Sequence, residues 1–309
     1  MLPSKLLAIP NVSEGRERST IDVIAAAFSD TASDAVSLLD VHSDADHHRS
    51  VFTLAGPPTG LARALLRGAQ AAVERIDVMS RTGRGHEEPG QHPHVGALDV
   101  MPIVYLDRAS RGAACAEALV VGDRIGGELG VPVFLYGELS GATPQEFRTR
   151  AELRRGGVVG LARRMAGGHV RLTPDFGPAR LHPTAGATLL AVREPLVAFN
   201  LQLAPPASVQ DAHRIAAQIR EGGAHGLPGE RAIGVSLQAG KLAQVSMNIE
   251  RPLEVPLATV VEAVRAHAEL HSAELVGLAP TAALEGFPDD LAMPGFDPAR
   301  HVIENALGC

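Results

Sequence analysis

Apolar and polar residues alternate between strand-like and helical spacing through the first part of the chain. Residues 5–10 form an apolar strand pattern, and apolar residues recur at helical spacing between Thr20 and Ser29. Further patterns predict strands over 35–41 and 50–56, a helix over 61–75, a strand over 97–106, a helix over 113–129 and a strand over 131–137. The predicted order of this part is β-α-β-β-α-β.

The second part of the chain repeats this order. The patterns predict a strand over 194–203, a helix over 208–221 with Ser208 as N-cap, strands over 232–237 and 243–249, a helix over 257–270 and a strand over 273–279. The expected fold class is therefore α/β (α+β), with two ferredoxin-like βαββαβ subdomains whose sheets carry helices on one face. We expect domains at 1–194 and 195–309, because one strand ends near Arg193 and Pro195 precedes the next.

Composition places the chain among globular proteins. Its 309 residues are 45% hydrophobic and 20% charged, which allows two domains with cores of their own. No apolar run is long enough for a membrane span, and the first twelve residues are too weakly apolar for a signal peptide. Cys115 and Cys309 are the two cysteines, so no disulfide framework is expected. The sequence predicts a cytosolic protein without a membrane partner.

Charge and aromatic content argue against nucleic acid as a partner. The net charge is −7, aromatic residues make up 3%, and tryptophan is absent. An acidic chain repels the phosphate backbone, and few rings remain to stack on bases.

Histidines suggest the first chemistry. The chain has 13, and several gather between residues 42 and 94, namely His42, His47, His48, His86, His92 and His94. Histidine titrates near neutral pH, binds metals and relays protons. Because Pro93 favours an extended conformation at His92, the side chains of His92 and His94 are expected to face one site. Acid–base catalysis is one interpretation, and ordinary loop histidines hydrogen-bonded to carbonyls are the other.

Three further segments have two interpretations each. The run from Asp40 to Arg49, with His42, Asp44, Asp46, His47 and His48, is either part of a divalent-metal site or a solvated turn. The glycine- and proline-rich run 175–188 is either a ligand-binding loop or a plain connector. The third segment is either an anion-attracting band or a solvated helix face, and it contains Arg148, Arg150, Arg154, Arg155, Arg163, Arg164 and Arg171.

Several motifs taken in order resemble those of the formiminotransferase family. They are PNVSEGR (10–16), LLDVHSDADHHRSVFTLAGPP (38–58), GQHPHVGALDVMP (90–102), VPVFLYGE (131–138), TPDFGP (173–178), TAGAT (184–188) and PLVAFNLQL (195–203). The resemblance continues through AHRIA and LAQVSMN in the second half, so it spans essentially the whole chain. It implies a two-subdomain α/β fold, a homodimer, and a stand-alone transferase without the cyclodeaminase found in animals.

The resemblance also implies a reaction of histidine catabolism and folate one-carbon metabolism. The formimino group of N-formimino-L-glutamate moves to N5 of tetrahydrofolate, which is the acceptor substrate, and no metal is expected. His92 takes the position of the catalytic histidine. The folate-binding loop maps onto Gly177, Pro178, Ala179, Arg180, Leu181, His182, Pro183, Thr184, Ala185 and Gly186.

The remaining site residues are inferred from their location and chemistry. Arg49 is expected to bind a substrate carboxylate through its bidentate geometry. The residues expected to line the substrate site with it are Asn11, Ser13, Glu14, His42, His48 and His94.

Three alternatives to this function stay open at the level of sequence. The donor is instead a formyl compound such as N-formylglutamate or another formimino compound, because Gln91 and His94 differ from the family pattern around the histidine. The protein is instead a non-catalytic folate binder, or a metal-dependent hydrolase built on the histidine and aspartate cluster.

Overall fold

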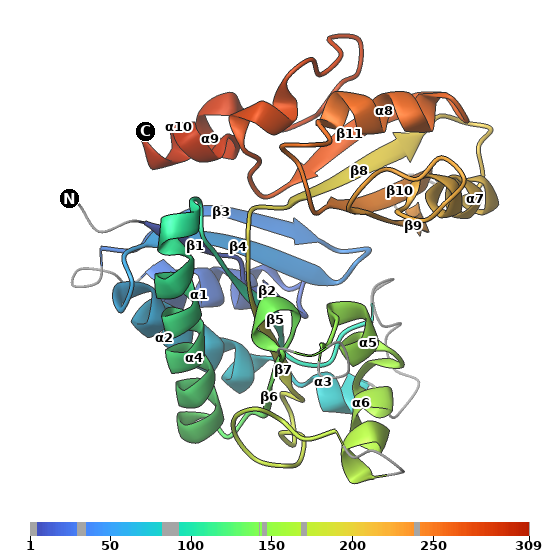
Figure 1. The fold of residues 1–309 in the computed structure, drawn as a ribbon. Coiled ribbons are helices and arrows are strands. Elements are labelled where there is room, and N and C mark those ends of the chain that lie inside the picture. The colour runs from blue at the N-terminus through green and yellow to red at the C-terminus, as the bar shows by residue number, and fades with distance from the viewer. Residues whose placement is uncertain are drawn as a thin grey trace. The chain divides into compact units, whose positions relative to one another are not determined.

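The structure is a computed structural model that describes residues 5–29, 35–81, 93–141, 143, 147–167, 172–237 and 242–308. The chain divides into two compact units, unit 1 over residues 1–194 and unit 2 over residues 195–309 (Figure 1). Each unit has a sheet and an apolar core of its own. In the described ranges, no helix has the combined length and apolarity that crossing a bilayer requires.

Unit 1 is built on one seven-stranded sheet. Its strands are β1 (Leu6–Ala8), β2 (Asn11–Val12), β3 (Ser37–Asp44), β4 (Arg49–Gly56), β5 (Leu98–Val104), β6 (Val133–Leu135) and β7 (Thr188–Arg193). Its helices are α1 (Arg18–Ser29), α2 (Gly60–Arg75), α3 (Val78–Arg81), α4 (Arg111–Glu128), α5 (Arg150–Arg154) and α6 (Gly157–Ala166). The strands follow the order β1-β4-β2-β5-β7-β6, and β3 pairs with β4. Strand β7 runs parallel to β5 and β6, whereas the other pairings are antiparallel.

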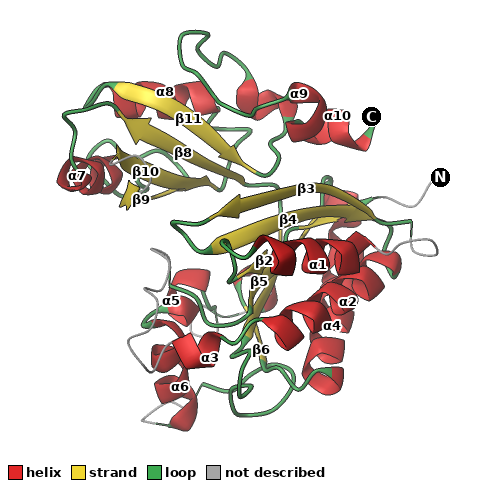
Figure 2. Cartoon of the chain, turned by 180° about the vertical axis from the view of Figure 1, so that it is seen from behind, coloured by secondary structure: helices red, strands yellow, loops and turns green. Residues whose placement is uncertain are grey.

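Helices cover both faces of this sheet (Figure 2). On one face α1, α2 and α4 share a core with the sheet, which contains Phe28, Leu65 and Val121. On the other face Leu161 of α6 packs with Phe134 of β6. The expectation of helices on one face is therefore wrong for unit 1. Its parallel strands are apolar on both sides, and a second layer of helices is needed to bury them.

The first strand predicted from the sequence, over 5–10, corresponds to β1 and ends before Pro10, which has no backbone N–H for the sheet ladder. Around this break Ile9 N–H donates to the carbonyl of Pro102 at 3.0 Å, and Phe52 N–H donates to the carbonyl of Pro10 at 2.9 Å. The chain resumes as β2, where Asn11 pairs with both β4 and β5. The residues that follow Val12 are thereby delivered to the ends of β4 and β5.

Helix α2 is capped by a residue from another helix. Thr59 at its N-cap makes no side-chain capping bond. The buried carboxylate of Glu117 in α4 accepts hydrogen bonds from the N–H groups of Thr59, at 2.8 Å, and Ala62, at 2.6 Å. This contact satisfies two of the free N–H groups at the start of α2 and ties α2 to α4.

Unit 2 has the predicted β-α-β-β-α-β order, followed by two short helices. Its elements are β8 (Val197–Leu203), α7 (Val209–Ile219), β9 (Glu230–Leu237), β10 (Leu242–Ile249), α8 (Leu257–Arg265), β11 (Leu270–Val276), α9 (Pro298–His301) and α10 (Ile303–Leu307). The four strands form an antiparallel sheet in the order β11-β8-β10-β9.

The core of unit 2 lies between this sheet and its two longer helices. Phe199 and Val245 of the sheet pack with Ile215 of α7 and Val261 of α8. Ser208 is the N-cap of α7, as the sequence predicts, and it forms a capping box with Asp211.

Candidate functional site

Glu14 follows β2 and is 4% exposed. Its Oε1 accepts hydrogen bonds from the backbone N–H groups of Arg16, at 2.9 Å, and Glu17, at 3.0 Å, and its Oε2 accepts one from Arg81 at 2.9 Å. Burial acts to raise the pKa of Glu14, but these hydrogen bonds and the nearby His48 hold it below its ordinary value. The carboxylate is therefore ionised, and groups of the chain itself occupy both oxygens.

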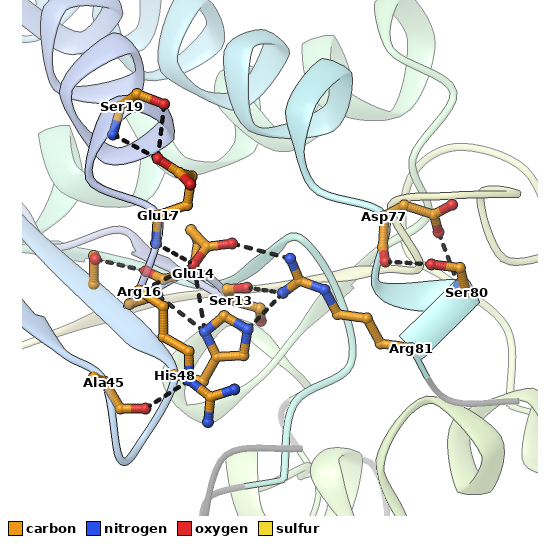
Figure 3. A network of polar contacts seen from close by, with 12 residues as sticks. Ser13, Glu14, Arg16, Glu17, Ser19, Ala45, His48, Asp77, Ser80 and Arg81 are labelled. Atoms are coloured by element: carbon orange, nitrogen blue, oxygen red, sulfur yellow. Dashed lines mark hydrogen bonds and ion pairs between the residues drawn. The ribbon is translucent and has the colours of Figure 1, made fainter. Parts of the chain in front are cut away.

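Arg81, at the end of α3, joins Glu14 to Ser13 and His48 (Figure 3). Its Nη1 donates to the carbonyl of Ser13 at 3.0 Å and lies 2.9 Å from Nε2 of His48. Nδ1 of the same ring lies 3.2 Å from the backbone nitrogen of Gly15 and 3.5 Å from Oε1 of Glu14. We call Ser13, Glu14, His48 and Arg81 the Arg81 network.

Local geometry places the parts of this network. A Cβ at Gly15 would lie 2.1 Å from the carbonyl oxygen of Asp44 and 2.5 Å from the nitrogen of Arg49, so only glycine allows this close approach to the β3–β4 hairpin. His48 lies in the turn of that hairpin with φ of 48°. Helix α3 begins after Asp77, whose carboxylate accepts the N–H of Ser80 at 2.9 Å.

A second group of charged residues surrounds Asp99, which is 2% exposed. Its Oδ1 accepts the N–H of Val95 at 2.7 Å, and its Oδ2 forms a buried ion pair with Arg154 of α5. Arg49 and His94 both interact electrostatically with this ion pair. We call Arg49, His94, Asp99 and Arg154 the Asp99 cluster.

Burial and neighbouring cations act on Arg49. Burial lowers the pKa of Arg49 to about 10, with Arg154 and Arg150 acting in the same direction and Asp99 and Asp44 against it. Three arginines thus meet two carboxylates, which leaves an excess of positive charge. This excess favours an anionic ligand.

Burial and charged neighbours act on His94 as well. Burial lowers the pKa of His94 below its ordinary value of 6.5, Asp99 opposes the shift, and Arg154 and Arg81 add to it. The imidazole is therefore neutral at pH 7.

The Asp99 cluster contains polar groups that the described part of the chain leaves without a hydrogen bond. The Nε2 atom of His94 and the Nε atom of Arg154 are both buried and unbonded. Among the described residues, no hydrogen bond or ion pair reaches the guanidinium of Arg49. A buried polar group without a partner costs about 1–3 kcal/mol, so such a group calls for a partner from outside the chain.

Hydrogen bonds to backbone carbonyls join three segments that are distant in the sequence, one of which follows His94. The Ser13 hydroxyl donates to the carbonyl of Gly96 at 2.7 Å. Ala97 N–H donates to the carbonyl of Ala185 at 2.8 Å, and Ala187 N–H donates to that of Val95 at 2.9 Å. The chain after residue 92 therefore lies between the 13–15 turn and the end of the 177–186 loop.

The start of the 177–186 loop is held by a different ion pair. Asp175 accepts the N–H of Leu135 at 2.7 Å and pairs with Arg148 at 2.7 Å. Near the other end, Nδ1 of His182 accepts the N–H of Ala185 at 3.0 Å. Both ends of the loop are thus attached to the sheet or closed on themselves.

The family models cover both units. The model of the formiminotransferase domain, N-terminal subdomain, matches residues 5–193, and that of the formiminotransferase domain matches residues 198–286. The chain belongs to the formiminotransferase family. The matches to both family models confirm the resemblance that the sequence motifs indicate.

Known members of the formiminotransferase family share about a third of their residues with this chain. Glutamate formimidoyltransferase of Streptococcus pyogenes is 35% identical over 305 residues, covering 97% of each chain. The enzyme of the same name from Thermoplasma acidophilum is 32% identical and covers 89% of this chain and 88% of its own. Formimidoyltransferase-cyclodeaminase of Gallus gallus is 37% identical, and the match spans 89% of this chain and 50% of that protein. The solved structure of pitrilysin aligns at 12% identity over 86% of this chain and 34% of its own, with a TM-score of 0.21.

Most residues predicted for the formiminotransferase site lie in the segments just described. Ser13, Glu14 and His48 meet in the Arg81 network, and Arg49 and His94 meet in the Asp99 cluster. His92, the predicted catalytic residue, lies outside the described residues.

Two other predicted residues lie in one row across unit 1. Strand register places His42 opposite Val51, and Val51 opposite Asn11. The Asn11 side chain donates to the carbonyl of Ile9 at 2.9 Å. Asn11 and His42 therefore share a sheet face with Arg49, which pairs with Asp44 in the same register.

The residues that the sequence offered as metal ligands under the alternative interpretation make other contacts where they are described. His47 lies 3.7 Å from Asp44, and His48 belongs to the Arg81 network. Within the described ranges, no three histidine, cysteine, aspartate or glutamate side chains are grouped as a metal ion would need.

The arginine band of the sequence divides among several roles. Arg148 pairs with Asp175, Arg154 pairs with Asp99, and Arg164 donates to the carbonyls of Leu153 and Arg155. Arg171 lies outside the described residues.

The sequence reasoning missed Arg81 and Asp99 and did not single out Arg154 from the band. Asp99 carried the one usable signal, because it is a carboxylate inside an otherwise apolar strand, and buried carboxylates are almost always paired. Arg81 carried no signal, since it looks like any basic residue at the end of a helix.

Proposed function

We propose that this chain transfers the formimino group of N-formimino-L-glutamate to N5 of tetrahydrofolate, with His92 as the general acid and base. Family membership across both units supports the activity, as do two relatives named glutamate formimidoyltransferase that match over nearly their full length. The proposal includes a cytosolic location and a homodimer. Light scattering on the purified protein tests the homodimer.

The observation that carries the donor site is the guanidinium of Arg49, which no hydrogen bond or ion pair reaches within the described part of the chain. Arginine matches a carboxylate through two parallel N–H bonds, and formiminoglutamate has two carboxylates. The excess of positive charge around Asp99 favours the same ligand. Arg49 therefore holds a substrate carboxylate, and the neighbouring strand positions of Asn11 and His42 line the same face.

The Arg81 network holds in place the backbone beside this site. Glu14 has both oxygens engaged by the chain, so its role is to hold the 13–15 turn in place. Ser13 in turn holds Gly96 through its hydroxyl. His48 completes the network through its contacts with Arg81 and the backbone nitrogen of Gly15.

The acceptor site follows from the 177–186 loop. Residues 185–187 pair with residues 95–97, so this loop lies next to the chain segment that follows His92. The loop is rich in glycine and proline, and such a composition lets the backbone approach a flat heterocycle such as the pterin of tetrahydrofolate.

The chemistry requires few protein groups. N5 attacks the formimino carbon and sheds a proton, which a neutral imidazole at residue 92 accepts and later returns to the departing glutamate nitrogen. Holding the two substrates in register removes the entropy cost of their encounter. The sequence of steps needs neither a metal ion nor a covalent enzyme intermediate.

The test is the His92→Ala variant. Transfer should fall by about 10²-fold or more, the usual contribution of a general acid–base group, while tetrahydrofolate binding stays within about twofold. Formation of 5-formiminotetrahydrofolate is followed spectrally, and binding is measured by calorimetry. His271→Ala, which removes an exposed imidazole on β11, is the matched control and should behave as wild type.

Two results would contradict the proposal. Turnover that survives in the His92→Ala variant removes His92 from the mechanism. A wild-type protein that binds tetrahydrofolate but accepts the one-carbon unit only from N-formylglutamate changes the donor.

A further inference from the structure

The unbonded atoms of the Asp99 cluster surround one ion pair. Asp99 accepts the N–H of Val95, the residue after His94, and also pairs with Arg154. Nε2 of His94 and Nε of Arg154 are buried without partners, and Arg49 interacts with the same ion pair. Within the described residues, two donor groups and one imidazole nitrogen that interact with this ion pair or belong to it are therefore left for a ligand.

Burial, more than any neighbouring charge, keeps the ring of His94 neutral. Of the charged groups that face it, Arg154 from α5 and Arg81 from α3 also favour the neutral ring, whereas Asp99 from β5 favours the charged one. An imidazolium here would add a third cation beside two arginines and one carboxylate. We assign the proton of this neutral ring to Nδ1, which leaves the lone pair of Nε2 for an N–H of the ligand; the other tautomer would make Nε2 a donor.

The ligand that fits carries a carboxylate and an N–H side by side. In an α-amino acid substituted on its nitrogen, both groups are attached to the same α-carbon. The γ-carboxylate of a glutamate has no nitrogen beside it. The α-end of formiminoglutamate therefore matches the cluster, and its nitrogen is the leaving group of the transfer.

We propose that His94 is a further catalytic residue, whose Nε2 accepts a hydrogen bond from the α-nitrogen of the donor while Arg49 and Arg154 hold the α-carboxylate beside it. This inference rests on the proposed formimino transfer. It identifies the end of the donor that the site recognises, and it assigns His94 to the leaving nitrogen.

The bond changes leave His94 with its own proton throughout. The bond from N5 to the formimino carbon forms, and the bond from that carbon to the glutamate nitrogen breaks. The proton lost by N5 ends on the glutamate nitrogen. His94 fixes the direction of the leaving N–H, so the formimino carbon faces N5 during attack.

The experiment pairs changes in the donor with changes in the protein. The donors are N-formimino-L-glutamate, its α-amide, its γ-amide and its α-N-methyl derivative, each assayed with tetrahydrofolate. The variants are Arg49→Met, His94→Ala and His94→Gln, with His271→Ala as the control. Coupling between a donor group and a residue shows as non-additive loss of kcat/KM.

The wild type should lose about 10- to 100-fold in kcat/KM with the α-amide and little with the γ-amide, the usual scale for a charge-assisted hydrogen bond. Arg49→Met should erase this discrimination. His94→Ala should lower kcat by about 10- to 100-fold with the parent donor, yet add little to the loss caused by the α-N-methyl group. His94→Gln should recover part of the activity, because its carboxamide oxygen also accepts.

Several outcomes would overturn the inference. If His94→Ala lowers kcat/KM by the same factor for every donor, including the N-methyl derivative, the residue has only a structural role. If the γ-amide is the poor donor and Arg49→Met erases that effect, the site reads the other end of glutamate. Failure of the proposed function is a separate result, since the wild type would then make no product from the parent donor. Tetrahydrofolate binding and thermal unfolding of each variant show whether the fold is intact.

Discussion

Glu230 offers a stability prediction in unit 2, independent of the site. It is the first residue of β9, fully buried, and neither carboxyl oxygen has a hydrogen-bond partner. Burial, together with the nearby Glu250, raises the pKa of Glu230 to about 8, from an ordinary value of 4.5. The folded chain therefore binds a proton that the unfolded chain has released at neutral pH.

The sign of the effect follows from linkage. The folded state holds more protons between pH 4.5 and about 8, so the free energy of unfolding falls as pH rises through this window. Each unit of pKa difference is about 1.4 kcal/mol, so the loss is roughly 3 kcal/mol at pH 7 and roughly 5 kcal/mol above pH 8. Stability from this residue is fully present only below pH 4.5.

Glu230→Gln keeps the shape of the side chain and removes the titration. Relative to wild type, the variant should have nearly equal stability at pH 4.5 and gain roughly 3 kcal/mol at pH 7, with a further gain at pH 8.5. Urea unfolding of the full chain, followed by far-UV circular dichroism at these three values, measures the difference. Glu250→Gln, a change at a half-exposed neighbour, should alter stability by only a few tenths of a kcal/mol.

The reasoning would be refuted by a difference between Glu230→Gln and wild type that does not change with pH. A variant that becomes less stable than wild type as pH rises would show that the carboxylate has a partner when ionised.

Two further substitutions test the contacts that shape unit 1. Gly186→Ala should lower the free energy of unfolding by more than about 2 kcal/mol, because its φ is 70° and a Cβ would lie 2.4 Å from the carbonyl oxygen of Val95. Gly130→Ala is the control, since its φ is 65° but the space around it is open, and it should cost only about 1–2 kcal/mol; equal losses in thermal unfolding would refute the packing argument. Glu117→Ala should lower the free energy of unfolding by about 2 kcal/mol, because both acceptors for the N–H groups of α2 are lost. Glu117→Gln should cost about half as much, because its amide keeps one oxygen acceptor, and urea unfolding that ranks the two variants the other way would contradict the capping role.

Much of the fold could be predicted because periodicity records burial directly. The strand predicted over 243–249 is β10, whose alternate residues enter the core of unit 2. The N-cap at Ser208 could be predicted for a different reason, because a cap depends on residues within one turn of the helix. Unit 1 departs from the prediction where α6 covers a second sheet face, because apolar runs in β5 and β7 show burial but not the layer that supplies it.

The sequence by itself determined which segments are candidates for the site, namely the turn after β2, the β3–β4 hairpin, the chain around residues 92–94 and the 177–186 loop. Only the tertiary structure decided which side chains meet. Arg81 reaches Glu14 across 67 residues, and Arg154 reaches Asp99 across 55. Periodic patterns report the burial of single residues, whereas the partner of a buried charge depends on how distant segments pack. That is why Arg49 could be proposed from its residue type, but the unbonded groups around it could not.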